Sequence, residues 1–306
     1  MLAHPVTRWL NEKLLGITGR RRLPLFAEQS LFQLVRKNHH ESQAGKPARV
    51  VFFVDTFANY FDVETGLAVL ETLRALDDFI LFAWAGETGS DDGCHSFGLQ
   101  CCGRPLISNG LLDEAVECAR NNVKRLYPYA AEGIPIVAAE PSCLLTMKDD
   151  YPALLRGDLR RRAERVAHLC QTFEEYVERR FAELPMSFRP WPRRIVVHGH
   201  CHQRSLVGME PTLQLLRRMP NADVRDSNAG CCGMAGSFGY EAEHYELSRD
   251  VGEQRLFPLL RKESSEATVA AAGFSCRVQI SHFTGVAAVH PAQIVAEALI
   301  RSSAGW

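Results

Sequence analysis

The amino-acid sequence predicts an α/β protein of two tandem, similar lobes, each a small parallel sheet flanked by helices. Apolar segments alternate along the chain with amphipathic segments, as parallel strands alternate with crossover helices. The motif CCG occurs at Cys101 and again at Cys231, and a cysteine at the end of a predicted strand follows each motif, at Cys143 and at Cys276. This repeat predicts that one structural unit occurs twice.

The first lobe is expected over residues 48–190. Its opening segment, 48–56, is continuously apolar and contains β-branched and aromatic residues, which is typical of a buried parallel strand. The later segments alternate between short apolar runs and longer amphipathic ones. Further strands are predicted over 79–85 and 133–145, and helices over 63–77, 110–132 and 158–184.

The second lobe is expected over residues 191–306, where the alternation restarts. Strands are predicted over 193–202, 222–227 and 267–280, and helices over 212–219, 243–262 and 291–300. In open parallel sheets, binding sites form beyond the carboxyl ends of the strands. We therefore expect the cysteines that come after the strands to mark such sites, one in each lobe.

Residues 1–47 differ from the rest of the chain, because they carry eight basic side chains against three acidic ones. Short amphipathic pieces are separated there by glycine and proline. The segment is interpreted either as a basic amphipathic arm that docks onto something or as a solvated basic linker, and the sequence leaves both open.

The composition limits the class of protein. The formal net charge of −1 gives no indication of a nucleic-acid partner, and we expect none. We see no apolar run of 18 residues and no secretory signal, so we expect a cytoplasmic protein without a membrane-spanning helix. Ten cysteines in such a chain favour metal binding or redox chemistry over disulfides.

The second lobe contains four cysteines that come after predicted strands: Cys201, Cys231, Cys232 and Cys276. Four thiolates suit either Zn²⁺ or an iron–sulfur cluster. The chain has no C-x-x-C, the usual half of a zinc site, which favours the larger cluster. The glycines of this loop would let the backbone approach the cluster and donate N–H groups to its sulfurs, and the candidates are Gly230, Gly233 and Gly236.

Six stretches together carry a family resemblance: VDTFANYF, CCGRPLISNGLLDEA, EPSCLLTMKDDY, HGHCHQRS, CCGMAGSFGYE and GFSCRVQI. Over about residues 48–300 the chain resembles the cysteine-rich CCG domain family of iron–sulfur oxidoreductases. That family includes a subunit of heterodisulfide reductase and the iron–sulfur subunits of glycolate oxidase and anaerobic glycerol-3-phosphate dehydrogenase. The chain is most similar to the C-terminal iron–sulfur region of FAD-linked D-2-hydroxy acid dehydrogenases of the D-lactate or D-2-hydroxyglutarate type.

The resemblance implies a [4Fe–4S] cluster in the second lobe. It also implies a corresponding cysteine set in the first lobe, made of Cys101, Cys102 and Cys143. Thr56 stands where many members of the family have a cysteine. Thr146 and Gln279 stand where a second late cysteine would make a five-cysteine cluster. Cys94 is a candidate substitute ligand for the first lobe.

The implied function is electron transfer in an iron–sulfur subunit or fragment of a flavin-dependent 2-hydroxy acid dehydrogenase. FAD and a ferredoxin-type domain are then expected on partner chains, because the sequence has neither a dinucleotide fingerprint nor a ferredoxin cysteine run. Alone, the chain is expected to be inactive. Peripheral association with the inner face of the membrane is left open. The alternatives are a heterodisulfide reductase-like thiol–disulfide enzyme and a zinc-stabilised binding module.

The remaining candidate residues have simpler interpretations. Cys118 and Cys170 lie in predicted helices and are expected to be buried small apolar side chains. Glu140 and Glu241 stand near the cysteine loops, where a proton relay is conceivable but a structural role is the expectation. Three histidines are expected to donate N–H groups to the cluster: His198, His200 and His202.

Overall fold

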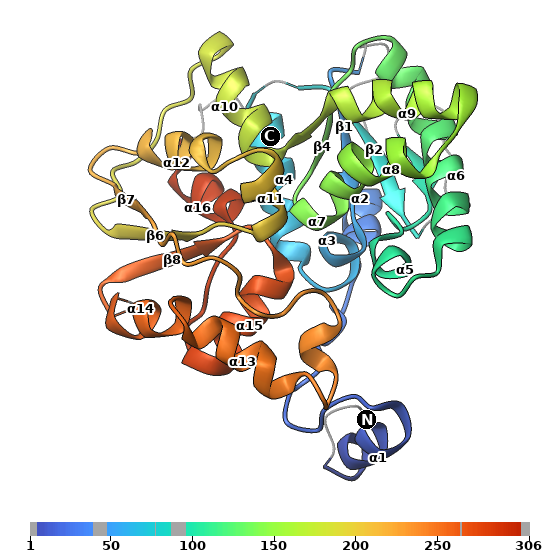
Figure 1. Ribbon diagram of the computed structural model, residues 1–306. Coiled ribbons are helices and arrows are strands. Elements are labelled where there is room, and N and C mark those ends of the chain that lie inside the picture. The colour runs from blue at the N-terminus through green and yellow to red at the C-terminus, as the bar shows by residue number, and fades with distance from the viewer. Residues whose placement is uncertain (1–4, 39–47, 77, 87–95, 264, 301–306) are drawn as a thin grey trace.

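Two all-parallel sheets flanked by helices make up the computed structural model, which describes residues 5–38, 48–76, 78–86, 96–263 and 265–300 (Figure 1). The predicted α/β class is therefore confirmed. The five strands of sheet one are β1 (Val50–Val54), β2 (Ile80–Ala85), β3 (Ser96–Leu99), β4 (Ile136–Ala138) and β5 (Cys170–Thr172). The three strands of sheet two are β6 (Arg194–His198), β7 (Asp223–Asp226) and β8 (Ala267–Ala271).

The strand order creates a switch point in each sheet. Sheet one has the order β3-β2-β1-β4-β5, so the chain leaves β1 toward one edge and later returns to β4 on its other side. Sheet two has the order β7-β6-β8, so the same reversal occurs between β6 and β8. At such points the loops after neighbouring strands diverge and leave a crevice, which is where ligands bind in open α/β sheets.

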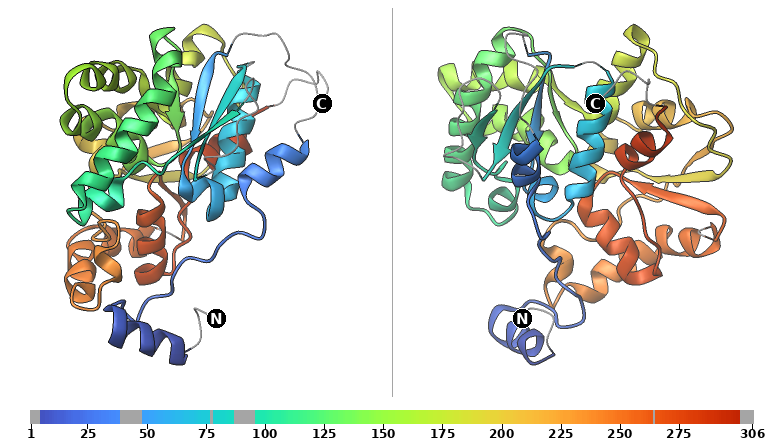
Figure 2. Two further views of the ribbon diagram at one scale, coloured as in Figure 1. Left: turned by 90° about the vertical axis from the view of Figure 1, so that its right-hand side faces the viewer. Right: turned by 180° about the vertical axis from the view of Figure 1, so that it is seen from behind.

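A layer of helices lies between the two sheets: α4 (Val63–Ala75), α10 (Phe173–Glu183), α12 (Glu210–Arg217) and α16 (Pro291–Ala298). Figures 1 and 2 show α16, near the carboxyl end of the chain, lying against α4 of the first lobe. One apolar core therefore runs from Val50, Phe52 and Val54 of β1 across this layer to Ile195 and Val197 of β6.

Two further cores lie on the outer faces of the sheets. Val51 and Phe53, the alternate residues of β1, pack in the core of sheet one together with side chains of α6 (Leu112–Ala131) and α9 (Gly157–Leu169). Sheet two is covered by α14 (Leu256–Glu263) and α15 (Phe274–Thr284). Alternation along β1 thus serves two cores, which explains why its sequence is continuously apolar.

Short helices begin soon after most strands or link the longer elements. They are α3 (Thr56–Tyr60), α5 (Arg104–Ser108), α7 (Pro141–Leu145), α8 (Tyr151–Leu154), α11 (Cys201–Leu206), the π-helix Thr146–Asp150 and the 3₁₀ helix Phe238–Tyr240. These early starts shorten three predicted strands, those over 133–145, 193–202 and 267–280. Within the described residues, no helix is both long and apolar enough to cross a membrane.

The predicted helix over 158–184 is wrong in its middle. The chain breaks there into α9, the strand β5 and α10, because residues 170–172 pair with β4. Thr172 then caps α10 in a capping box with Glu175, which fixes the start of the new helix. Cys170 is fully buried as expected, but it lies in a strand. The predicted helix over 243–262 is likewise two helices, α13 (Tyr245–Glu253) and α14.

The N-terminal arm divides into two described helices. α1 (Pro5–Leu15) projects beside α13, where the backbone of Thr18 donates a hydrogen bond to the Tyr240 carbonyl at 2.7 Å (Figures 1 and 2). α2 (Leu31–Asn38) packs on the first lobe and buries Leu31 in its core. The described residues 5–38 of the arm therefore contact the rest of the protein at both of these places.

Candidate metal centre

The four cysteines of the second lobe come together at the switch point of sheet two. Cys201 is the first residue of α11, which follows β6, and Cys276 lies in the first turn of α15, which follows β8. Cys231 and Cys232 stand in the loop after β7. Helix starts present unpaired N–H groups and a positive dipole end, which favour thiolates.

The four sulfur atoms form one contiguous group. The Sγ atoms of Cys232 and Cys276 lie 3.4 Å apart. Cys231 is in hydrogen-bond contact with both Cys201 and Cys232. Cys232 and Cys276 are buried, whereas Cys231 is half-buried and Cys201 is exposed. The group therefore has a closed inner end and an open outer end at Cys201.

A salt bridge holds the two sides of this group together. Arg204 of α11 makes two contacts with Asp226, at 2.9 and 2.6 Å. Asp226 ends β7 and also accepts a hydrogen bond from the Asn228 N–H at 2.8 Å. The helix that carries Cys201 is thus tied to the loop that carries Cys231. Sequence reasoning missed this pair, although Asp226 is the last but one residue of the strand predicted over 222–227.

Gly233 is required by packing as well as by backbone conformation. Its φ is +90°, and a Cβ atom there would lie 2.1 Å from the Ser248 carbonyl oxygen of α13. The loop therefore needs glycine here to lie against that helix. Gly230 and Gly236 also have positive φ, but a Cβ atom at either would meet open space. The Gly233 N–H donates to the Cys231 sulfur at 3.3 Å.

The electrostatics of this group favour thiolates at two of the four positions. Hydrogen bonds from Cys201 and Cys232 lower the pKa of Cys231. A hydrogen bond from Cys232 lowers the pKa of Cys276 against the effect of burial, and the nearby His198 imidazole acts in the same direction. Ionising all four thiols at these distances needs a positive partner, because thiolates so close repel one another. The group is therefore suited to a metal ion or cluster.

The first lobe assembles only three sulfurs. Cys101 and Cys102 follow β3, Cys143 lies in α7, and Cys102 contacts both of the others. Thr56, at the start of α3, makes a hydrogen bond with Cys101. The position that a fourth cysteine sulfur would take in this set is therefore occupied by the hydroxyl group of Thr56. Cys94 lies outside the described residues, so its predicted role stays a prediction.

The environment of the first-lobe cysteines disfavours thiolates. A hydrogen bond from Cys102 lowers the pKa of Cys143, but burial and the nearby carboxyl groups of Asp55 and Glu140 outweigh it and raise the pKa to about 12. Contact with Cys102 raises the pKa of Cys101. Lobe one thus has carboxyl groups beside its thiols, where lobe two has imidazoles.

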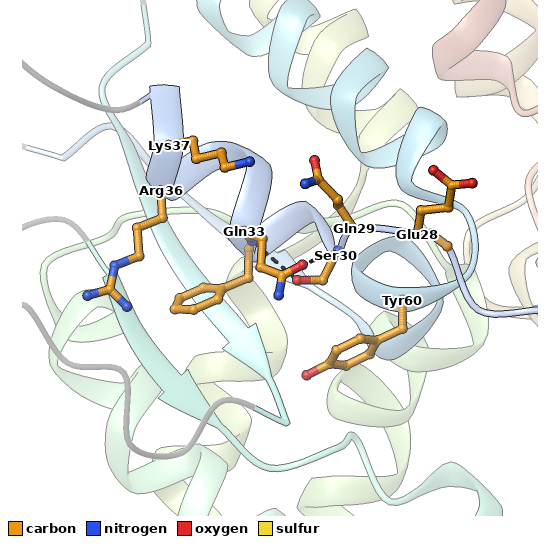
Figure 3. Close-up of a pocket in the computed structure, with 9 residues that line it drawn as sticks. Glu28, Gln29, Ser30, Gln33, Arg36, Lys37 and Tyr60 are labelled. Carbon is orange, nitrogen blue, oxygen red and sulfur yellow. Dashed lines mark hydrogen bonds between the residues drawn. The ribbon is translucent and has the colours of Figure 1, made fainter.

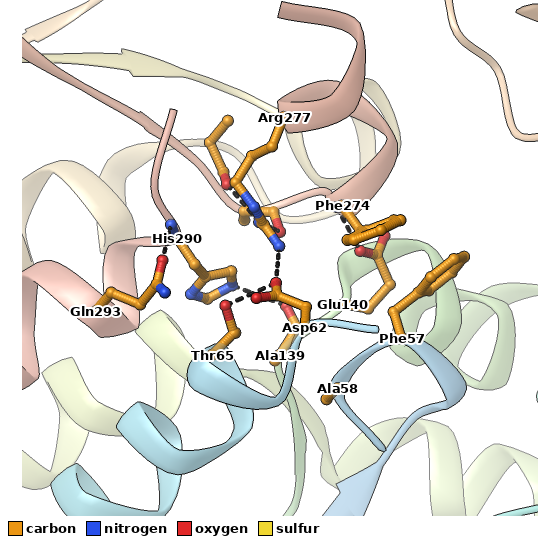
Figure 4. A network of polar contacts seen from close by, with 12 residues as sticks. Phe57, Ala58, Asp62, Thr65, Ala139, Glu140, Phe274, Arg277, His290 and Gln293 are labelled. Carbon is orange, nitrogen blue, oxygen red and sulfur yellow. Dashed lines mark hydrogen bonds and ion pairs between the residues drawn. The ribbon is translucent and has the colours of Figure 1, made fainter. Parts of the chain in front are cut away.

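Two buried carboxyl groups stand at the switch point of sheet one, where Asp55 follows β1 and Glu140 follows β4. Figure 4 shows Glu140 beside Phe274 of the second lobe. Glu140 accepts hydrogen bonds from the Ser142 N–H at 3.2 Å and from the Phe274 N–H at 2.7 Å. One carboxylate therefore caps both α7, which carries Cys143, and α15, which carries Cys276. Burial and then the Glu140 charge raise the pKa of Asp55 to about 7. These contacts favour a structural role for Glu140. In the sequence, the indication that the two carboxyl groups meet was that each comes soon after a strand of the same sheet.

A second ionic contact crosses between the lobes beside Glu140. Arg277 of α15 pairs with Asp62, which precedes α4 (Figure 4). His290 of the second lobe contacts the Ala139 carbonyl oxygen through Nε2 at 3.1 Å. The crevice lined by these groups holds only about 10 Å³, room for about one water molecule. At this crevice the contact between the lobes is therefore polar and leaves almost no free volume.

The other residues that the sequence singled out contribute no sulfur to the four-sulfur group. Cys118 is only half-buried on α6, where its Cβ faces Gly103, so the prediction that it is a buried side chain is wrong. Gln279 is buried and donates a hydrogen bond from its amide to the Cys232 carbonyl at 2.9 Å. Thr146 donates to the Ser142 carbonyl. Glu241 pairs with His244 at 2.7 Å.

A separate open hollow of about 1040 Å³ lies along α2 (Figure 3). Glu28, Gln33, Arg36, Lys37 and Tyr60 are among its lining residues. Its lining includes none of the cysteines described above, so it contributes nothing to the four-sulfur group.

The comparison with protein families first identifies the class of domain. Residues 93–148 match the cysteine-rich domain, CCG. This segment contains the first CCG motif together with Cys143. The resemblance predicted from the cysteine motifs is therefore confirmed at the level of the domain.

Curated relatives then extend along nearly the whole chain. One subunit of the anaerobic glycerol-3-phosphate dehydrogenase of Escherichia coli (strain K12) is 28% identical over 298 residues, which cover 95% of this chain and 69% of the relative. D-2-hydroxyglutarate dehydrogenase of Haemophilus influenzae is 26% identical over 96% of this chain and 28% of the relative. One subunit of the fumarate reductase (CoM/CoB) of Methanothermobacter marburgensis is 25% identical over 80% of this chain and 44% of the relative. The chain is thus similar to subunits or parts of larger oxidoreductases.

We expect the variant Thr56→Cys to bind a second equivalent of Co²⁺. The new thiol would stand beside Cys101 and complete a four-sulfur set in lobe one, which is the number that a tetrahedral metal site needs. The measurement is titration of metal-free protein with Co²⁺, followed by the thiolate-to-metal absorption. Thr72→Cys is the control, because Thr72 is buried in α4 and bonds to the Ala68 carbonyl, away from these cysteines. Equal stoichiometry in the two variants would contradict the prediction.

Proposed function

We propose that the chain is an iron–sulfur electron-transfer subunit, or a fragment with that role, of a flavin-dependent 2-hydroxy acid dehydrogenase. The observation that carries the proposal is the contiguous group of four sulfurs at the switch point of sheet two. Similarity to a glycerol-3-phosphate dehydrogenase subunit and to D-2-hydroxyglutarate dehydrogenases supports it.

The residues proposed to hold a [4Fe–4S] cluster are Cys201, Cys231, Cys232 and Cys276. Three observations fit this group. The sulfurs already contact one another, the Gly233 N–H points at the Cys231 sulfur, and the buried imidazole of His198 stands beside Cys232 and Cys276. When bound, such a cluster supplies one-electron redox chemistry. Gly230 and Gly236 would admit the backbone turns of the loop, since both have positive φ.

Electron exchange with a partner would take place at the Cys201 end of the group. Cys201 is exposed, whereas Cys232 and Cys276 are buried. A cofactor on a partner chain can therefore approach the outer end, and the protein excludes water from the inner end. The buried end limits access of solvent and oxygen, which protects thiolate ligands from oxidation.

The partners proposed are a flavin-containing dehydrogenase chain, which would hold FAD, and a ferredoxin-type domain. The two lobes are proposed to divide at 48–190 and 191–306, with 1–47 as the arm. We place the chain in the cytoplasm, with peripheral contact at the inner face of the membrane. Exposed Trp9 and Leu14 on α1, beside Arg8 and Lys13, support that contact, because such helices lie on anionic lipid surfaces.

Two other functions account for part of the same geometry. A heterodisulfide reductase-like enzyme is favoured by similarity to the fumarate reductase (CoM/CoB) subunit of Methanothermobacter marburgensis. A zinc-stabilised module is favoured by the four sulfurs alone. The position of Gln279, whose amide bonds to the Cys232 carbonyl, counts against a five-cysteine cluster in lobe two.

The experiment that tests the proposal is metal and sulfide analysis of anaerobically purified protein, before and after treatment with iron and sulfide. We expect about one [4Fe–4S] cluster per chain. Visible absorption should be broad, and an EPR signal should appear in at least one redox state. Stoichiometric zinc with no iron after this treatment would refute the cluster and leave the zinc module.

A further inference from the structure

His198 lies against the buried end of the four-sulfur group. It is the last residue of β6, the central strand of sheet two. One of its ring nitrogens and the Sγ atoms of Cys232 and Cys276 all lie within 4.8 Å of one another. The side chain is 2% exposed, so bulk water does not reach the ring.

Neither ring nitrogen of His198 makes a hydrogen bond of good geometry among the residues that the structure describes, and the ring instead acts on the neighbouring Cys276 thiol. A buried polar atom without a well-formed hydrogen bond destabilises the folded state, so two on one ring need an explanation. Buried His290 gives the contrast: its Nε2 contacts the Ala139 carbonyl at 3.1 Å and its Nδ1 accepts the Ala292 N–H at 2.9 Å. The fold thus provides hydrogen-bond partners for both ring nitrogens of His290, whereas the ring of His198 faces the thiols of Cys232 and Cys276.

The two neighbouring histidines are placed differently. The ring of His200 lies over Gly273, where a Cβ atom would be 2.5 Å from its Cδ2. Burial and then the nearby Arg104 guanidinium of lobe one lower the pKa of His202, so this ring lies on the side of the first lobe. In the described part of the chain, His198 is the histidine that groups with cysteine sulfurs at ligand spacing.

We propose that His198 binds the metal centre of lobe two directly, through a ring nitrogen, beside Cys232 and Cys276. The proposal rests on the function proposed above, in that a metal centre occupies this lobe. Imidazole nitrogen is a ligand for both iron and zinc, and histidine ligands raise the potential of an iron–sulfur centre relative to cysteine alone. Lobe two would then hold its centre by sulfur and nitrogen together.

The first test uses whole protein labelled with ¹⁵N-histidine and loaded anaerobically with iron and sulfide. We expect pulsed EPR to detect strong coupling of a histidine nitrogen to the paramagnetic centre. The coupling should disappear in His198→Gln and persist in His202→Gln, the matched control. A full cluster without strong histidine coupling would overturn the His198 proposal while leaving the electron-transfer function intact.

The second test adds Co²⁺ to metal-free protein. It tests whether His198 binds metal even if the protein takes up no iron, and an absence of iron would count against the proposed function alone. We expect His198→Gln to weaken Co²⁺ binding roughly tenfold or more and to shift its visible bands. His198→Cys should restore the affinity with a spectrum of higher thiolate content. An unchanged Co²⁺ spectrum in His198→Gln would overturn the proposal whatever the affinity, because loss of an outer-shell partner alone can weaken metal binding about tenfold.

Discussion

We expect the variant Cys232→Ser to retain less than about half of the iron that the unaltered chain binds, because a weaker oxygen ligand replaces a thiolate in a buried position. Cys232 contacts Cys231 on one side and Cys276, at 3.4 Å, on the other. Its loss therefore separates the buried end of the sulfur group from the exposed end. Iron per chain and visible absorbance of anaerobically loaded protein measure the effect.

The control for this prediction is Cys118→Ser. Cys118 is half-buried on α6 of the first lobe, so the cluster should survive with a modest loss of stability. Cys101→Ser reports on the first lobe: if the three-sulfur set holds no iron, its spectrum should hardly change. Full occupancy in Cys232→Ser together with loss of iron in Cys118→Ser would refute the second CCG motif as the metal-binding loop.

The positions of the cysteines relative to the strands could be predicted because both depend on local sequence. Apolar runs of three to six residues mark β1, β2 and β6, and parallel strands deliver the residues after them to one edge of the sheet. Cys201 comes soon after β6, and Cys276 comes soon after β8. The sequence therefore indicated where a site would form.

Short or polar strands could not be predicted in this way. β5 contains only Cys170, Gln171 and Thr172, and it exists because β4 is available for pairing. The helical periodicity of the sequence before and after β5 continues across residues 170–172, so the pattern gave no sign that the helix ends there. The T-x-x-E signature of Thr172 and Glu175 was the available indication of a new helix start.

The electrostatic contrast between the two cysteine sets needed the tertiary structure. The CCG motifs are alike, but His198 stands beside Cys276, whereas Asp55 and Glu140 stand near Cys143. Those carboxyls come from neighbouring strands that are far apart in sequence. Their effect on thiol ionisation depends on burial at the switch point, which no spacing rule reveals.

We expect Glu140→Ala to have the largest effect on folding stability outside the cysteines. The carboxylate accepts three hydrogen bonds, from the Ser142 N–H, the Ser142 hydroxyl at 2.7 Å and the Phe274 N–H, and only the alanine methyl group would remain. Loss of these bonds should lower the free energy of unfolding by about 2–4 kcal/mol. Removing the negative charge also relieves Asp55, whose pKa should fall, and this offsets part of the loss.

The matched control is Glu175→Ala, which removes a carboxylate that caps a single helix. Glu175 accepts the Thr172 N–H at 2.9 Å, and its loss should cost about 1 kcal/mol. Urea unfolding followed by tryptophan fluorescence measures both. Because Glu140 joins α7 of the first lobe to α15 of the second, Glu140→Ala should also release iron faster under a chelator, whereas Glu175→Ala should not. Equal unfolding midpoints and equal iron release in the two variants would show that the bond to Phe274 does not hold Cys276 in place.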